Sequence, residues 1–218
     1  MNAKNYSKEM DNIIKSFEGS DRIPSVLLHS CCAPCSSTCL EQLTPYFHVT
    51  VLYYNPNITQ KSEYDKRVEE EIRFINSLNK AGGFGNNDDF HRISFMDGRY
   101  APEEFFAIAK GYEDCPEGGE RCFRCYELRL REAATVAKAS GFDFFATTLT
   151  LSPLKNAPRL NEIGQALSAE YGVAYLPSDF KKKNGYKRSI ELSEEYNLYR
   201  QNYCGCVYSK RRDFAGLQ

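Results

Sequence analysis

Short apolar runs alternate with amphipathic segments along this chain, and this alternation restricts the possible folds more than any other feature. The runs that predict buried strands are 25–30, 48–55, 90–95, 143–150 and 172–177. Segments with helical character lie between and beside them, at 37–43, 59–80, 102–112, 126–141 and 159–172. Strands joined by helical crossovers favour a parallel sheet. We therefore expect an α/β fold, doubly wound around a mostly parallel five-stranded sheet.

The length and composition indicate one globular domain. The 218 residues are 42% apolar and 26% charged, and they contain no internal repeat. We expect a helical extension over 1–24, a single catalytic domain over 25–218, and a mainly helical, basic C-terminal segment. No apolar run approaches the roughly 20 residues that span a bilayer, and the polar N-terminal residues do not resemble a secretory signal. These features predict a cytoplasmic protein with no membrane partner.

Nine cysteines are the strongest chemical signal in the sequence. In a reducing compartment such a number favours metal binding or redox chemistry over a disulfide framework. Seven of them form three groups, namely Cys31, Cys32 and Cys35 directly after the first strand, Cys122 and Cys125 at C-x-x-C spacing, and Cys204 and Cys206 at C-x-C spacing. Soft thiolates select zinc, copper(I) or iron–sulfur clusters. Because ligands of doubly wound sheets bind at the carboxyl ends of strands, the first group lies at an expected site.

Spacing alone does not choose between zinc and an iron–sulfur cluster. Adjacent cysteines are atypical of a zinc knuckle, and Arg121 and Arg124 beside the C-x-x-C pair favour an anionic centre. The C-x-C pair is compatible with metal ligands or with a strained, easily reduced disulfide. The two remaining cysteines, Cys39 and Cys115, are expected to be ordinary small apolar residues. His29 is expected to be a core residue, with a role as ligand or acid as the minor alternative.

Positive charge is concentrated in the second half of the chain. Residues 1–120 carry 12 Lys and Arg against 19 Asp and Glu, whereas residues 121–218 carry 16 against 10. Two segments, 181–188 and 209–213, hold most of the clustered basic residues. Basic stripes with interleaved aromatic residues suit phosphate neutralisation and base stacking on RNA. The residues predicted to contact RNA are Lys181, Lys182, Lys183, Tyr186, Lys187 and Arg188. Tyr54 is a second candidate for stacking on a base. The alternative for both tyrosines is that they belong to the core.

Several long motifs together resemble one known family. They are "LLHSCCAPCSS", "YYNPNI" with "EYDKRVEEE", "PEGGERCFRCYELRL", "TTLTLSPLKN" and "SDFKKKNGYKRSIELSEEYNLYRQNYCGC", and they occur in order over almost the whole chain. The sequence is similar to the cobalamin-independent epoxyqueuosine reductases. The resemblance implies a fold related to the adenine-nucleotide alpha-hydrolase (HUP-like) group. It also implies the last step of queuosine synthesis, a two-electron deoxygenation of the epoxyqueuosine base in tRNA.

The resemblance also assigns roles to the clustered cysteines. It implies an iron–sulfur cluster of the 4Fe–4S type on Cys31, Cys32, Cys122 and Cys125, and an additional iron for which Cys35 is the best-placed ligand. Cys204 and Cys206 fall on the motif expected to be redox-active, so the residues expected to be catalytic are Cys35, Cys204 and Cys206. An electron donor such as a ferredoxin or flavodoxin is a further expected partner. Candidate proton donors are water, Tyr126, Tyr203 and Asp179.

The sequence leaves two functions from other classes open. An ATP-dependent tRNA-modifying enzyme of similar fold would need a glycine-rich phosphate cradle after the first strand, where this chain has "SCCAPCSS". A zinc-stabilised RNA-binding module without catalytic activity would explain the basic segments and the C-x-x-C pair. It would leave Cys31, Cys32 and the C-x-C pair unexplained.

Overall fold

The computed structural model describes residues 4–85 and 89–210. Within these residues five strands form one sheet in the order β3-β2-β1-β4-β5, and every neighbouring pair is parallel. The strands are β1 (Ser25–His29), β2 (His48–Tyr53), β3 (Ser94–Asp97), β4 (Phe144–Thr147) and β5 (Ala174–Tyr175). The expected α/β fold with a doubly wound, five-stranded sheet is confirmed, and the described sheet is entirely parallel.

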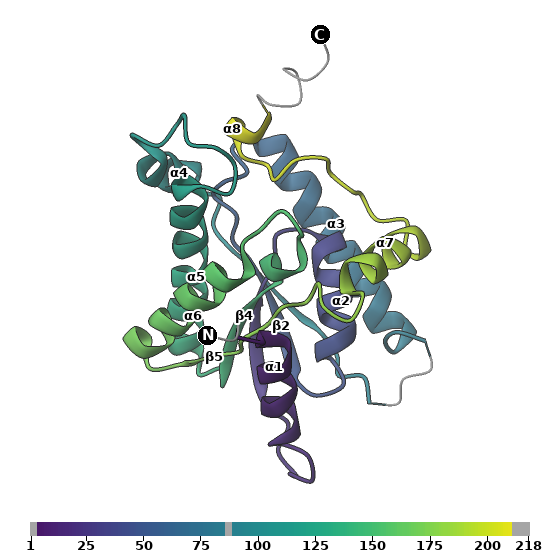
Figure 1. Cartoon of the computed structure of the whole chain (residues 1–218). Helices are drawn as coiled ribbons and strands as arrows, with labels where there is room; N and C mark the ends of the chain where they lie inside the picture. The colour runs from purple at the N-terminus through teal and green to yellow at the C-terminus, as the bar shows by residue number, and fades with distance from the viewer. Residues whose placement is uncertain (1–3, 86–88, 211–218) are drawn as a thin grey trace.

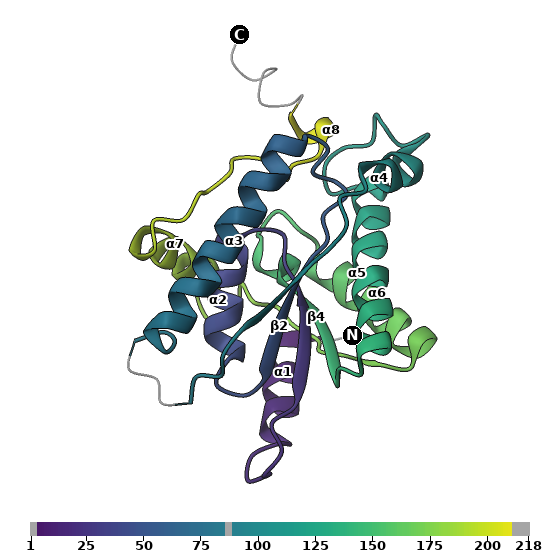
Figure 2. The same cartoon turned by 180° about the vertical axis from the view of Figure 1, so that it is seen from behind.

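Helices cover both faces of this sheet. They are α1 (Tyr6–Lys15), α2 (Ala33–Leu43), α3 (Lys61–Ala81), α4 (Pro102–Ala109), α5 (Glu120–Ser140), α6 (Ala157–Tyr171), α7 (Gly185–Glu195) and α8 (Val207–Lys210), with a 3₁₀ helix η1 (Thr148–Leu151). Figures 1 and 2 show α2, α3 and α7 on one side and α5 and α6 on the other. α8 lies beside the N-terminal end of α3, at the end of the molecule opposite the turn that follows α1 (Figure 1).

The two faces of β1 contribute to separate apolar cores. Val26 and Leu28 pack in the core that faces α2 and α3, and Leu27 packs in the core that faces α5 and α6. All three side chains are completely buried. Strands of a parallel sheet are covered on both faces, and they therefore appear in sequence as continuous apolar runs.

The boundaries of several elements differ from the prediction. α2 begins at Ala33 and α5 at Glu120, four and six residues earlier than expected, because both predictions assigned the cysteine-rich segments to loops. Pro34 is favourable in the first turn of α2, where its missing N–H would have no partner. The third strand lies at 94–97 instead of 90–95. The fourth strand ends at Thr147, whose side chain accepts a hydrogen bond from the amide of Leu149 and so begins η1.

The strand order creates a switch point between β1 and β4. From β1 the chain proceeds outward to β2 and β3, and it then returns to place β4 on the opposite side of β1. Segments that follow β1 and β4 therefore diverge and leave a crevice at the carboxyl ends of these strands. Thr148 meets Cys31 there, with its Oγ1 3.3 Å from the amide nitrogen of Cys31.

A buried carboxyl group supports the end of β1. Glu71 of α3 has no exposed surface, and its Oε2 accepts a hydrogen bond of 3.1 Å from the hydroxyl of Ser30. Burial raises the pKa of Glu71 to about 8, although hydrogen bonds from Ser36 and Ser30 act in the opposite direction. The carboxyl group is therefore mainly protonated at neutral pH.

We predict that Glu71 makes the folded protein less stable as the pH rises. Its pKa is higher in the folded state than in the unfolded chain. The contribution of Glu71 to the free energy of unfolding is therefore complete below about pH 4.5 and is lost as the pH rises toward about 8. Within this pH range the free energy of unfolding falls by up to about 1.4 kcal/mol per pH unit. Glu71→Gln should be more stable than the unmodified protein at pH 8, with a smaller pH dependence in denaturant unfolding. Equal pH dependence in both proteins would contradict a protonated Glu71.

Candidate metal centre

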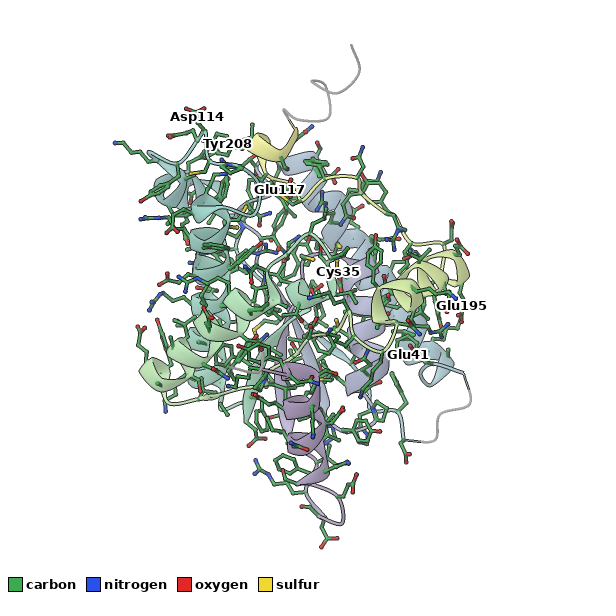
Figure 3. All side chains as sticks on the ribbon, viewed as in Figure 1. Cys35, Glu41, Asp114, Glu117, Glu195 and Tyr208 are labelled. Atoms are coloured by element: carbon green, nitrogen blue, oxygen red, sulfur yellow. The ribbon has the colours of Figure 1, made fainter. Side chains whose placement is uncertain are left out.

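Three thiols converge at the carboxyl end of β1. The Sγ atoms of Cys31, Cys32 and Cys35 all lie within 4.8 Å of one another, and those of Cys31 and Cys32 are 3.8 Å apart. Cys31 and Cys32 follow the strand directly, and Cys35 lies in the first turn of α2. Figure 3 labels Cys35 in the interior of the molecule, between the helices on the two sides of the sheet. Three soft donors at this separation are able to hold a metal ion.

The environment of these thiols favours negative charge. Hydrogen bonds from Cys32 and Cys35, together with the cations Lys155 and Arg129, hold the pKa of Cys31 well below its usual value. The pKa of Cys32 rises to about 12, chiefly through its hydrogen bond to Cys31. The surroundings therefore favour a single negative charge on Cys31, and metal ligation favours deprotonation of the other thiols.

The C-x-x-C pair lies in the first turns of α5. At i and i+3, Cys122 and Cys125 share one side of the helix, and both line a small cavity of about 30 Å³. The amide of Gly118 donates a hydrogen bond of 3.3 Å to Sγ of Cys122. Burial raises the pKa of Cys125 to about 11.

The C-x-C pair reaches the same small cavity from the C-terminal segment. The carbonyl of Cys204 accepts hydrogen bonds from Nδ2 of Asn57 at 3.0 Å and from the guanidinium of Arg67 at 3.4 Å. Gly205 between the cysteines has a φ of +98°, and a Cβ there would lie 2.7 Å from Cγ1 of Ile58. Only glycine fits this close turn, which directs Cys204 and Cys206 toward the cavity. Both thiols are free in the structure.

A larger cavity of about 400 Å³ adjoins the small one, because five residues line both. The large cavity includes Cys31 and Cys35 together with Tyr186 of α7. The five shared residues are Glu117, Arg129, Lys155, Cys204 and Ser209. The three cysteine groups predicted from sequence therefore surround two connected cavities.

Two of the shared residues are cations without an acidic partner. Among the described residues, neither Arg129 nor Lys155 forms an ion pair with a carboxylate, although Arg129 is only 3% exposed. Burial alone would lower the pKa of Lys155, but negative charge on the sulfur atoms around it, first of all Cys31 and then Cys204 and Cys35, raises it. Buried charge is unfavourable unless it is compensated. The pair of cations therefore fits an anionic group held by the surrounding sulfur atoms, as a thiolate-ligated metal centre would be.

The predicted RNA-contacting residues in and just before α7 differ in their surroundings. Tyr186 is 40% exposed and lines the large cavity, as stacking on a base requires. Several of the basic residues instead form ion pairs, namely Lys181 with Asp179 at 2.8 Å, Lys183 with Asp11 at 2.7 Å, Lys187 with Glu191 at 3.9 Å and Arg188 with Glu41 at 2.7 Å. Lys182 is exposed and has no ion pair with a described residue. Of the other basic segment, residues 211–213 lie outside the described residues.

Tyr54 is not available to stack on a base. Its ring has no exposed surface, and its hydroxyl donates a hydrogen bond to Glu104. Tyr54 is therefore a core residue, which was the alternative that the sequence left open. His29 and Cys39 are also fully buried in the core, with the two ring nitrogens of His29 3.0 Å from Thr147 Oγ1 and from the carbonyl oxygen of Tyr54. Cys115 lines neither cavity.

The structure separates the candidate proton donors. Tyr126 lines the small cavity and Tyr203 the large one, whereas Asp179 pairs with Lys181 and lines neither. Lys155 and Arg129 were not recognised from the sequence as site residues. Lys155 belongs to the "TTLTLSPLKN" motif, which follows β4. Because β4 lies beside β1 at the switch point, the strand order expected of a doubly wound sheet could have indicated that this motif lies near Cys31.

Comparison with known proteins shows the family of this chain. The model of the family described as "Epoxyqueuosine reductase QueH" matches residues 26–212. The chain belongs to this family. A protein of Staphylococcus epidermidis named epoxyqueuosine reductase QueH is 44% identical over 94% of this chain and 84% of its own length. Relatives of the same name from Streptococcus pyogenes and Thermotoga maritima are 42% and 37% identical, over 95% and 85% of this chain and 78% and 90% of their own lengths.

Membership of the epoxyqueuosine reductase QueH family confirms the resemblance seen in the sequence motifs. The names of these relatives favour neither the zinc-stabilised RNA-binding module nor the ATP-dependent enzyme. The described residues contain no helix both long and apolar enough to cross a membrane.

Proposed function

We propose that this chain is an epoxyqueuosine reductase that deoxygenates the epoxyqueuosine base of tRNA to give queuosine. The observation that carries the proposal is the meeting of three cysteine groups and two cations, neither of which pairs with a described carboxylate, around connected cavities. The reaction breaks both C–O bonds of the epoxide, forms a C=C bond and releases the oxygen as water. It consumes two electrons and two protons, so a redox centre and proton donors must lie together.

We propose a 4Fe–4S cluster on Cys31, Cys32, Cys122 and Cys125, with Cys35 available to an additional iron. The donor set is suitable because iron–sulfur clusters are held by thiolates, and Arg129 and Lys155 would compensate their negative charge. Such a cluster, when bound, would supply electrons one at a time and an iron able to act as a Lewis acid on the epoxide oxygen. The cluster type and its ligands are inferred from the motifs and from this charge balance.

The side chains around the cavities suit the remaining requirements of the reaction. A volume of about 400 Å³ is within the range typical of small-ligand sites, so the large cavity is large enough for a modified base turned out of the anticodon loop. Tyr186 offers an exposed ring for stacking. The ammonium of Lys155 would donate a hydrogen bond to the departing oxygen, and Tyr126 or Tyr203 would provide a proton.

The partners of the reaction follow from its chemistry. The substrate is a tRNA, and electrons would come from a small carrier such as a ferredoxin or flavodoxin. We place the reaction in the cytoplasm, where thiols remain reduced; all nine cysteines lie in the described part of the chain and all are free.

An anaerobic conversion assay tests the proposed function. The purified protein, loaded with iron and sulfide and supplied with a chemical reductant, is incubated with tRNA that carries epoxyqueuosine. Nucleoside mass spectrometry should show that the modified nucleoside loses one oxygen atom. A protein with a full metal centre that leaves the epoxide unchanged would refute the proposal.

The proposed cluster ligands predict the effect of single substitutions. Replacing any one of Cys31, Cys32, Cys122 or Cys125 with Ser should lower the iron and sulfide content and abolish the reduction, because a hydroxyl is a much poorer ligand than a thiolate. Cys115→Ser is the matched control and should retain both. Full iron and sulfide content in Cys122→Ser would remove that residue from the ligand set.

Cys204 and Cys206 are predicted to act in redox chemistry and not as cluster ligands. A bond between them would form as two thiols lose two electrons and two protons, which matches the stoichiometry of the reduction. Cys204→Ser and Cys206→Ser should each suppress turnover while the cluster absorbance and the affinity for tRNA persist. Normal turnover in both variants would exclude the role, and loss of iron would reassign the residues as ligands.

The ion pairs predict unequal contributions of the lysines to tRNA binding. Lys182 is free to contact a phosphate, whereas Lys183 must first leave Asp11. Lys182→Gln should therefore reduce the slope of log affinity against log salt by about 0.7–0.9, the value of one phosphate contact. Lys183→Gln is the matched control and should change the slope less. An unchanged slope in Lys182→Gln would show that this residue makes no phosphate contact.

A further inference from the structure

The segment that joins α7 to α8 is held against α3 by charged side chains. This segment, residues 196–206, is called the strap here, and it runs beside α3 in both views of the molecule (Figures 1 and 2). The guanidinium of Arg73 donates hydrogen bonds of 3.1 and 3.2 Å to two strap carbonyls, and Glu70 accepts one of 2.7 Å from the amide of Tyr199. Nearer the C-terminal end of the strap, Arg67 donates to two further carbonyls at 3.3 and 3.4 Å. The middle of the strap is therefore fixed from both sides.

Gln201, in the middle of the strap, contacts one of the proposed cluster ligands. Its amide nitrogen Nε2 donates a hydrogen bond to Sγ of Cys32. Cys32 is only 1% exposed, so water hardly competes for this sulfur. The reverse orientation of the amide would bring its carbonyl oxygen against the sulfur, where it would repel a thiolate. Because metal ligands of this kind must be deprotonated, the observed orientation is the one that a loaded site requires.

The other end of the same amide shows that packing alone does not explain its position. The carbonyl oxygen Oε1 of Gln201 is buried and has no hydrogen-bond partner among the described residues. A buried acceptor without a partner makes the folded state less stable, and an apolar side chain of similar size would avoid this cost. The N–H group directed at the sulfur is therefore the part of this side chain that calls for a functional explanation.

We propose that Gln201 is a positioning residue whose hydrogen bond to Cys32 raises the reduction potential of the cluster. When the cluster takes one electron from its carrier, negative charge increases on the iron and on its sulfur ligands. An N–H donor stabilises the reduced form more than the oxidised form, and hydrogen bonds to the sulfur atoms are among the factors that set such potentials. The inference rests on the ligand set of the proposed function. It adds that the strap, which also carries Cys204 and Cys206, determines how readily the cluster accepts an electron.

Two substitutions of Gln201 test this role. Gln201→Met removes the donor and keeps the length of the side chain, whereas Gln201→Asn keeps an amide but withdraws it from the sulfur by one methylene. The midpoint potential is measured by anaerobic redox titration of the iron- and sulfide-loaded protein, with electron paramagnetic resonance of the reduced cluster as the readout. At a fixed solution potential, Gln201→Met should shift the ratio of reduced to oxidised cluster up to tenfold toward the oxidised form. This corresponds to a midpoint about 59 mV more negative for one electron, and Gln201→Asn should lie between.

Tyr199→Phe is the matched control for a change in the strap itself. It removes only the hydroxyl that lies 3.2 and 3.3 Å from the two carboxylate oxygens of Glu63, and it leaves the amide of Gln201 in place. The midpoint potential of this variant should equal that of the unmodified protein. An equal shift in Tyr199→Phe and Gln201→Met would show that the position of the strap, and not the hydrogen bond, sets the potential, and it would overturn the inference.

The remaining outcomes separate this inference from the proposed function. A midpoint potential in Gln201→Met that equals or exceeds that of the unmodified protein would overturn the inference. Loss of iron from both Gln201 variants would also overturn it, because the residue would then hold the cluster and not tune it. Neither measurement depends on turnover. The predicted shift in a loaded protein that leaves epoxyqueuosine unchanged would support the role of Gln201 and count against the reductase function.

Discussion

Two cations that form no ion pair with a described carboxylate, the buried Arg129 and the partly exposed Lys155, dominate the electrostatics at the centre of this molecule. Arg129 and Lys155 line both cavities, and the groups around them that are able to carry negative charge are mainly thiols. Uncompensated cations in such an environment are costly. A thiolate-ligated metal centre would supply the missing negative charge, so folding around the site and loading of the metal should be coupled.

The topology explains why distant cysteines meet. Cys31 and Cys32 follow β1 at the switch point, and Cys35 lies beside them in the first turn of α2. Cys122 and Cys125 lie near the N-terminus of α5 and line the neighbouring cavity. The C-terminal segment completes the arrangement, since Asn57 and Arg67 hold the carbonyl of Cys204. Each group comes from a separate part of the chain, and the lining residues that the cavities share join them into one site.

The sequence predicted the sheet well because its strands are buried on both faces and therefore appear as apolar runs. It also predicted the cysteine groups, whose spacing is local. It did not predict where α2 and α5 begin, since cysteine has no strong helical signal. The positions of Arg129 and Lys155 in the site were also missed, because a charged residue becomes informative only when the groups around it are visible. Tyr54 was misjudged as a stacking candidate for a similar reason: aromatic residues are equally common in cores.

The most direct measurement is anomalous X-ray scattering from crystals of the anaerobically prepared protein. Data collected on either side of the iron absorption edge should show iron bonded to the sulfur atoms of Cys31, Cys32, Cys122 and Cys125, beside Arg129 and Lys155. A signal at the zinc edge alone, or iron bonded to residues away from these two cations, would contradict the account.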